Sequence, residues 1–189
     1  MWADYTGLPW VMPSPNLPSL DTATVYPGAC FVEGTNVSEG RGTTRPFELI
    51  GAPWIDGRAL ADLLDDLGLA GCRFRPVFFE PRFSKHAGQV CGGVQIHVLD
   101  RDVFRPVRTG VHVLAAIRKL CPDQFQWIGT PEQAAAGRLH IDLLAGTDGL
   151  RQTLDSGGDR RPIDDLLSKW EADAAGFVKD RERFLVYRS

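Results

Sequence analysis

The sequence lacks the features that mark several common classes of protein. No apolar run is long enough to cross a bilayer, and the N-terminus, MWADYTGLPW, has neither the basic start nor the apolar core of a signal peptide. The formal net charge is −3 over 189 residues, and no basic face for binding phosphates is concentrated anywhere. We therefore expect a soluble protein with neither membrane nor nucleic acid as a partner. Its compartment stays open: cytoplasmic, or extracytoplasmic if the chain is a fragment of a secreted precursor.

Standard catalytic and cofactor motifs are missing too. The sequence has no G-x-G-x-x-G, no phosphate-binding G-x-x-x-x-G-K-[ST] and no H-E-x-x-H, and neither Ser14 nor Ser38 lies in a G-x-S-x-G context. A metal site made of His86, Cys91 and His97 would lack standard ligand spacing, so we predict no metal and no cofactor. The four cysteines form no C-x-x-C pair, and we favour free, mostly buried thiols.

Composition and periodicity predict a single α+β domain. At 43% hydrophobic and 24% charged, the chain has enough apolar content for a core. Apolar residues recur at helical spacing in four segments, and short strands lie among them without regular strand–helix alternation. The expected helices are 56–67, 109–120, 147–154 and 162–184, and the expected strands are 74–79, 94–99 and a possible one at 24–32. We expect a short mixed sheet with the helices packed on it.

Residues 1–28 are dense in proline and predict an ordered, extended arm, with residues 29–189 as the body. The prolines exclude a helix from the run WVMPSPNLPS, and Asn16 sits between two of them with its orientation fixed. We expect the arm and the apolar C-terminal tail, FLVY, to pack on the body. The arm residues expected to do so are Trp2, Trp10, Met12 and Leu17. The alternative is a rigid linker.

The stretch from Glu33 to Glu48, EGTNVSEGRGTTRPFE, is unlike packing sequence. It has almost no apolar content, which favours a loop over a core strand or an amphipathic helix. Glycines on both sides of Arg41 let the backbone approach a ligand closely. With Arg41, the side chains of Glu33, Asn36 and Glu39 supply acceptors and donors suited to a polyhydroxylated ligand. A solvated surface loop is the alternative interpretation.

Two neighbouring features support the ligand hypothesis. Trp54 follows the polar stretch, and an aromatic beside a polar loop is a typical sugar-stacking arrangement, although it is as often simple core. The loop PRFSKHAGQVCGG carries Lys85 and His86 and is the second candidate for ligand contacts.

Four long motifs resemble one bacterial family. They are TGLPWVMPSPNLPS, VYPGACFVEGTNVSEGRGTTRPFELIGAPW, FEPRFSKHAGQVCGGVQIHVLDR with FRPV, and IDLLAGTDGLR. Together they resemble the NamZ-like exo-β-N-acetylmuramidases, formerly a family of unknown function, over nearly the whole chain. The resemblance implies release of N-acetylmuramic acid from the non-reducing end of cell-wall glycans. It also implies an N-terminal Rossmann-like domain with a Glu-His-Gly motif, which has no counterpart here. We therefore expect a C-terminal, substrate-side domain, a fragment that is inactive alone.

The resemblance also suggests roles for residues of the polar stretch. Glycoside hydrolysis uses two carboxyl groups, and Glu33 and Glu39 are the expected catalytic pair. Arg41 is expected to bind the lactyl carboxylate of muramic acid, with an internal ion pair to Glu33 or Glu39 as the alternative. Asn36 and Thr43 are expected to bind hydroxyls or the N-acetyl group. The remaining expected substrate contacts are Asn16, Trp54 and His86.

A function of a different class stays open: a non-catalytic carbohydrate-binding or protein-docking module. It fits the absence of a complete catalytic constellation and the apolar arm. The expected partners are a muramic-acid-containing glycan, the N-terminal catalytic domain in cis or in trans, and a second copy of the chain through an exposed domain interface.

Overall fold

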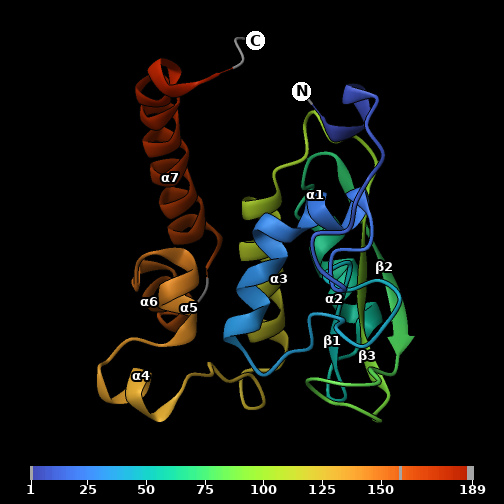
Figure 1. The fold of residues 1–189 in the computed structure, drawn as a ribbon. Helices are drawn as coiled ribbons and strands as arrows, with labels where there is room; N and C mark the ends of the chain where they lie inside the picture. Colours follow the sequence, from blue (N-terminus) through green and yellow to red (C-terminus); the bar gives the residue numbers. More distant parts are fainter. Residues whose placement is uncertain (1, 158, 187–189) are drawn as a thin grey trace.

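The computed structural model describes residues 2–157 and 159–186 and shows an α+β fold built in layers (Figure 1). A small sheet lies on one side of the molecule. Helices α1 (Leu20–Ala29) and α3 (Pro106–Leu120) stand beside it, and the C-terminal helices form a further layer beyond α3 (Figure 1). The predicted fold class is confirmed.

The sheet contains β1 (Leu49–Ala52), β2 (Cys72–Phe79) and β3 (Cys91–Val98) in the order β1-β3-β2. Both pairings are antiparallel, so the sheet is not mixed as expected. Ile50 lies opposite Val94, and Phe74 lies opposite Ile96. All four side chains belong to the core.

Helix α2 (Gly57–Asp66) packs on β2 and β3. Asp56 caps it by accepting hydrogen bonds from the backbone N–H groups of Arg58 and Ala59. Its leucines Leu60 and Leu64 are fully buried, as the helical spacing predicted. The helices expected at 56–67 and 109–120 and both main strands are therefore confirmed within a few residues.

The possible strand at 24–32 is wrong, because residues 20–29 form helix α1, followed by the 3-10 turn η2 (Cys30–Gly34). Ser19 caps α1 by accepting from the Thr22 N–H. A side chain at Gly28 would collide with the Pro106 backbone, and one at Gly110 with Gly28. Close packing of α1 against α3 thus overrides the breaker signal of Pro27, the proline inside α1.

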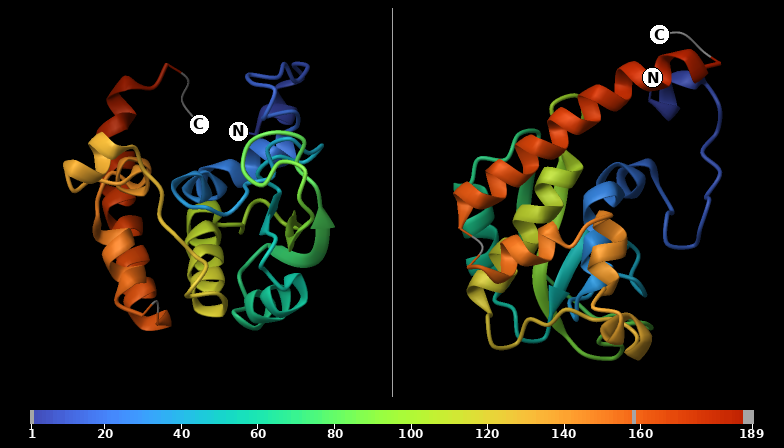
Figure 2. Two further views of the ribbon diagram at one scale, coloured as in Figure 1. Left: turned by 90° about the horizontal axis from the view of Figure 1, so that it is seen from below. Right: turned by 90° about the vertical axis from the view of Figure 1, so that its left-hand side faces the viewer.

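The C-terminal layer holds the short helices α4 (Pro131–Ala135), α5 (His140–Ala145) and α6 (Gly149–Asp155), followed by α7 (Arg160–Arg181) and the turn η3 (Glu182–Phe184). Ile163 and Leu167 anchor the start of α7 in the core. Its second half projects away from the body (Figure 2), and Phe177 is exposed. The tail does not dock as expected, since Phe184, Leu185 and Val186 are exposed, and Tyr187 lies outside the described residues.

The N-terminal arm begins with the 3-10 turn η1 (Ala3–Thr6). Here Trp2 donates from Nε1 to Asp102 at 3.0 Å, and Leu17 is half-buried. The run from 10 to 19 contains no helix, as predicted. Trp10 and Met12 are exposed rather than packed, which corrects the expectation for these two residues. No helix in the described part of the chain is long and apolar enough to span a bilayer.

Candidate functional site

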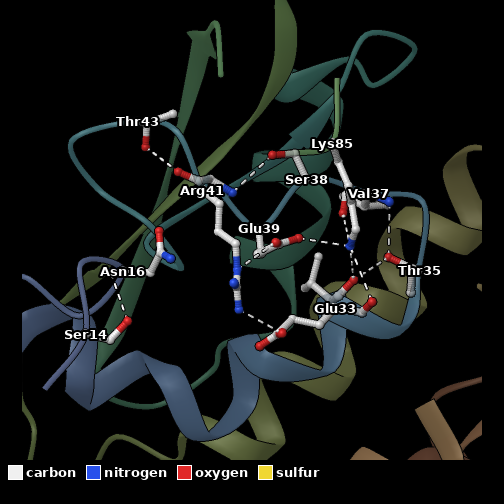
Figure 3. Close-up of polar contacts among 12 residues, drawn as sticks. Ser14, Asn16, Glu33, Thr35, Val37, Ser38, Glu39, Arg41, Thr43 and Lys85 are labelled. Atoms are coloured by element: carbon white, nitrogen blue, oxygen red, sulfur yellow. Dashed lines mark hydrogen bonds and ion pairs between the residues drawn. The ribbon is translucent and has the colours of Figure 1, made fainter. Parts of the chain in front are cut away.

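Four charged side chains converge in one cluster, which we call the Glu39 cluster: Glu33, Glu39, Arg41 and Lys85 (Figure 3). Arg41 Nη2 lies 2.8 Å from Glu33 Oε2, and Arg41 Nε lies 3.0 Å from Glu39 Oε1. Lys85 Nζ lies 2.9 Å from Glu39 Oε2. Glu39 is only 3% exposed, whereas the side chains of Glu33 and Arg41 are 21% and 32% exposed. The cluster therefore has a buried floor and a solvent-facing edge.

Three separate segments build the cluster. The turn η2 supplies Glu33. Backbone hydrogen bonds in both directions between Ser38 and Gly51 fasten the loop to β1, and this places Glu39 at the edge of the sheet. The loop between β2 and β3 supplies Lys85. Sequence reasoning placed the first two segments in the site and gave the third only second rank.

Lys85 is the functional residue that sequence reasoning underrated. Besides Glu39, its ammonium group contacts the carbonyl oxygens of Val32 at 2.9 Å and Val37 at 3.0 Å. An ammonium has three donors, so these partners saturate it. Burial lowers the pKa of Lys85, and the neighbouring Glu39 carboxylate opposes that shift. Lys85 acts as a fixed internal cation that ties the loop together.

The backbone on both sides of Lys85 is strained. Ser84 has a φ of 71° and His86 a φ of 57°, in the left-handed region that disfavours residues with a side chain. Phe47, next to the cluster, has a φ of 64°. Such outliers gather at functional sites, where the surrounding contacts hold them in place. No local sequence signal reveals them.

The two ion pairs of Glu39 are short but poorly directed. Glu39 Oε2 and Arg41 Nε both lie within ion-pair distance of an opposite charge, yet neither makes an aligned hydrogen bond within the described residues. We regard these contacts as Coulombic attraction without directional bonding. Buried polar atoms in this state are rare in native proteins and mark sites that can rearrange around a ligand.

Arg41 lies against an aromatic ring as well as the two carboxylates. Its guanidinium carbon is 5.3 Å from the Phe47 ring centre, a cation–π contact, and Phe47 in turn meets Tyr26 edge-on at 4.8 Å. The expected alternative for Arg41, an internal ion pair, is therefore present with Glu33 and Glu39 at once. No partner within residues 2–157 or 159–186 is recorded for its Nη1 group, which leaves donor capacity for a ligand.

Other predicted site residues have structural contacts of their own. The Asn36 amide donates to the Gln124 carbonyl at 2.8 Å and accepts from the Gln126 N–H at 2.9 Å. His86 Nε2 lies 2.8 Å from the Asn36 carbonyl oxygen. Thr43 donates to the Gly40 carbonyl at 2.6 Å. These groups shape the loop, and their contacts with substrate stay predictions.

Trp54 and Asn16 lie differently. Trp54 is half-buried and packs against the hydrophobic core, and its carbonyl accepts from the Cys121 thiol. Asn16 is half-buried on the arm, where its N–H is held by Ser14 Oγ at 3.2 Å. Both Asn16 and Ser14 appear in the close-up of the Glu39 cluster (Figure 3).

A second buried glutamate lies at the end of the same loop and was missed by sequence reasoning. Glu48 is 3% exposed, accepts from the Thr22 hydroxyl at 2.8 Å and pairs with Arg45 at 3.1 Å. It lines a cavity of about 210 Å³, which Gln95 and His97 also border. We call this cavity the Glu48 pocket.

The cysteines and the metal hypothesis leave the Glu39 cluster as the main chemical feature. All four cysteines are free, and three of them are buried, as expected. Across the described ranges, no three His, Cys, Asp or Glu side chains are grouped so that they could hold a metal ion.

The structure thus defines a small α+β domain whose polar loop gathers two carboxylates and two cations at one point. The family pattern described as "Exo-beta-N-acetylmuramidase NamZ, C-terminal" matches residues 24–187. The chain belongs to this family.

Known relatives cover almost all of the chain. It is 42% identical over 184 residues to the peptidoglycan β-N-acetylmuramidase NamZ of Bacillus subtilis, an alignment that spans 97% of this chain and 42% of the relative. Two crystal structures of DUF1343 family proteins from Bacteroides fragilis are also similar, each at 25% identity. Their TM-scores are 0.81 and 0.63, covering 98% and 94% of this chain and 47% and 44% of theirs. The chain spans less than half the length of each of these proteins.

Proposed function

We propose that this chain is the substrate-side, C-terminal domain of a peptidoglycan glycoside hydrolase that releases terminal N-acetylmuramic acid. The Glu39 cluster is its half of the substrate site, and an N-terminal domain, in cis or in trans, supplies the rest. The chain alone binds the glycan without cleaving it, because interactions that bind substrate do not replace a missing catalytic group.

The observation that carries the proposal is that one arginine joins two carboxylates at the open edge of the cluster. Arg41 holds Glu33 at 2.8 Å on its exposed side and Glu39 at 3.0 Å on its buried side. A ligand carboxylate, such as the lactyl group of muramic acid, competes with Glu33 for the guanidinium in a charge-assisted pair. Glu33 is then free to face the sugar, while Glu39 and Lys85 keep Arg41 in place.

Glu33 and Glu39 are the proposed carboxyl groups of the reaction, since glycoside hydrolysis needs a pair of them. Their environments differ, because Glu33 meets solvent and Glu39 lies between two cations. Thr43 and Asn16 are proposed to contact the hydroxyl and N-acetyl groups. Asn36, His86 and Trp54 are proposed to border the same site.

The test is calorimetric titration of the 189-residue chain with two disaccharides. One ends in N-acetylmuramic acid, and the other has N-acetylglucosamine in its place and so lacks the lactyl carboxylate. We expect binding of the first only, and a loss of about 10- to 100-fold in affinity in Arg41→Ala, which removes a charge-assisted pair. The control is Arg58→Ala, which removes an exposed arginine on α2 that pairs with Asp62. Equal affinity for both sugars would refute the role of Arg41.

A second candidate function is a protein-docking module, and the exposed apolar residues favour it. Leu8, Val11 and Met12 on the arm and Phe177 on α7 are exposed. Such surfaces mark interfaces with another domain or with a second copy of the chain. Sedimentation of the chain at rising concentration tests the homodimer, and a monomer at all concentrations would exclude it.

A further inference from the structure

The loop between β2 and β3 is fastened to the polar loop at several points. Arg82 donates its backbone N–H to the Gly42 carbonyl at 3.0 Å. Lys85 enters the Glu39 cluster, and His86 meets the Asn36 carbonyl. A surface loop held by this many polar contacts presents its remaining side chains in fixed positions.

Phe83 lies within this fastened segment and directly against Gly42. The Gly42 φ of 83° is in the left-handed region, and a Cβ built at Gly42 would lie 2.7 Å from both the backbone N and O of Phe83. Gly42 follows Arg41 and precedes Thr43 in the chain. The Phe83 backbone therefore sits beside the proposed sugar contacts, and only a glycine permits this approach.

The Phe83 side chain is nevertheless 55% exposed. The fixed backbone means that this exposure is a property of the fold and not of a mobile loop tip. Ligand sites combine a few polar groups with apolar and aromatic surface, and the Glu39 cluster supplies only the polar part. The other nearby aromatic, Phe47, is 1% exposed and lies under Arg41, and Trp54 packs on the core.

We propose that Phe83 is the stacking platform for a pyranose ring of the glycan that pairs with Arg41. The faces of a pyranose carry C–H groups, which pack on the electron-rich face of an aromatic ring. This inference rests on the proposed function and adds the apolar half of the recognition site. It assigns to Phe83 the role that sequence reasoning gave to Trp54.

The test is titration of Phe83→Ala, Phe83→Trp and Phe78→Ala with the muramic-acid-terminated disaccharide, together with saturation-transfer NMR from the aromatic protons to the sugar. Phe78 is 82% exposed on β2 and serves as the matched control for loss of an exposed phenylalanine. We expect about 3- to 10-fold weaker binding by Phe83→Ala, restored binding by Phe83→Trp, and no change in Phe78→Ala.

The outcomes separate this inference from the proposed function. If the wild-type chain binds the disaccharide and Phe83→Ala binds it equally well, the platform role is wrong and the proposed function stands. If the wild-type chain does not bind, the proposed function fails, and the platform fails with it. Phe83→Trp guards against misfolding, since its amide spectrum must match that of the wild type while saturation transfer to the sugar persists.

Discussion

Two glutamates in one loop are equally buried but bonded in opposite ways. Glu39 and Glu48 are each 3% exposed. Both oxygens of Glu48 are satisfied, one by the Thr22 hydroxyl and one by Arg45. Glu39 lies between two cations, yet its Oε2 accepts no aligned hydrogen bond from the described residues.

The comparison shows how burial and function can be told apart. A buried carboxylate with complete hydrogen bonding holds structure, as Glu48 does between α1 and the loop. A buried carboxylate held by charge alone, in a frame of strained backbone, is poised for a ligand that completes its bonding. The following changes test whether the two glutamates differ in this way.

Lys85→Met is the change with the largest expected effect. It leaves Glu39 buried with only Arg41 as a counter-charge, and breaking a buried pair from one side costs about 3 to 5 kcal/mol of unfolding free energy. Urea denaturation measures this. Lys119→Met, at an exposed lysine on α3, should stay within about 0.5 kcal/mol of the wild type. A similar small effect in both variants would show that Lys85 is not the internal cation described here.

Gly42→Ala comes next and tests the close approach beside the Glu39 cluster. A Cβ there meets the Phe83 backbone at a left-handed φ of 83°, and we expect a loss of about 2 to 3 kcal/mol in unfolding free energy. Gly68→Ala is the matched control, because its φ is 65° and no atom lies within 4 Å of the added Cβ. It should lose only about 1 kcal/mol. Equal losses would mean that the two loops are not tightly apposed.

Glu48→Gln should have a smaller effect on stability and none on glycan binding. The glutamine oxygen can still accept from Thr22, and only the pair with the half-exposed Arg45 is weakened, so about 1 kcal/mol is lost. Glu39→Gln should weaken binding of the muramic-acid disaccharide by about 10-fold, because Arg41 loses its charged anchor. Weaker binding in Glu48→Gln alone would place the ligand in the Glu48 pocket instead.

The smallest expected effect is on the alkaline stability profile. Burial lowers the pKa of Lys85 below its ordinary 10.5, so the unfolded chain holds more protons just below pH 10.5. The unfolding free energy that Lys85 contributes therefore rises with pH up to 10.5. Burial also raises the pKa of Cys30 and Cys91 to about 11, which destabilises above pH 9, but equally in both proteins. The difference between wild type and Lys85→Met should grow toward pH 10.5, and a flat difference would contradict this.

Periodicity predicted the parts of the fold that depend on local pattern. The leucines of α2 and the alternation in β3 gave the right elements at the right places. The strand expected at 24–32 failed because contact between Gly28 and Gly110, far apart in sequence, decides that segment as a helix. The exposed apolar residues of the arm and tail were predicted to pack because hydrophobicity alone does not show what a side chain meets.

The candidate site was predictable in composition and not in geometry. The polar stretch pointed to Glu33, Glu39 and Arg41, which do converge. Lys85 reaches them across about 50 residues of chain, and only the antiparallel pairing of β2 and β3 places its loop there. Likewise, Glu48 reads as loop polarity in the sequence, whereas the fold buries it beside Thr22.

The most direct test of the account is an amide NMR titration of the 189-residue chain with the muramic-acid-terminated disaccharide. The account predicts that the largest shifts fall on Glu39, Arg41, Gly42 and Lys85, with the amides around Glu48 and Gln95 nearly unmoved. Shifts centred on the Glu48 pocket, with the Glu39 cluster silent, would contradict the claim that the incompletely bonded glutamate marks the glycan site.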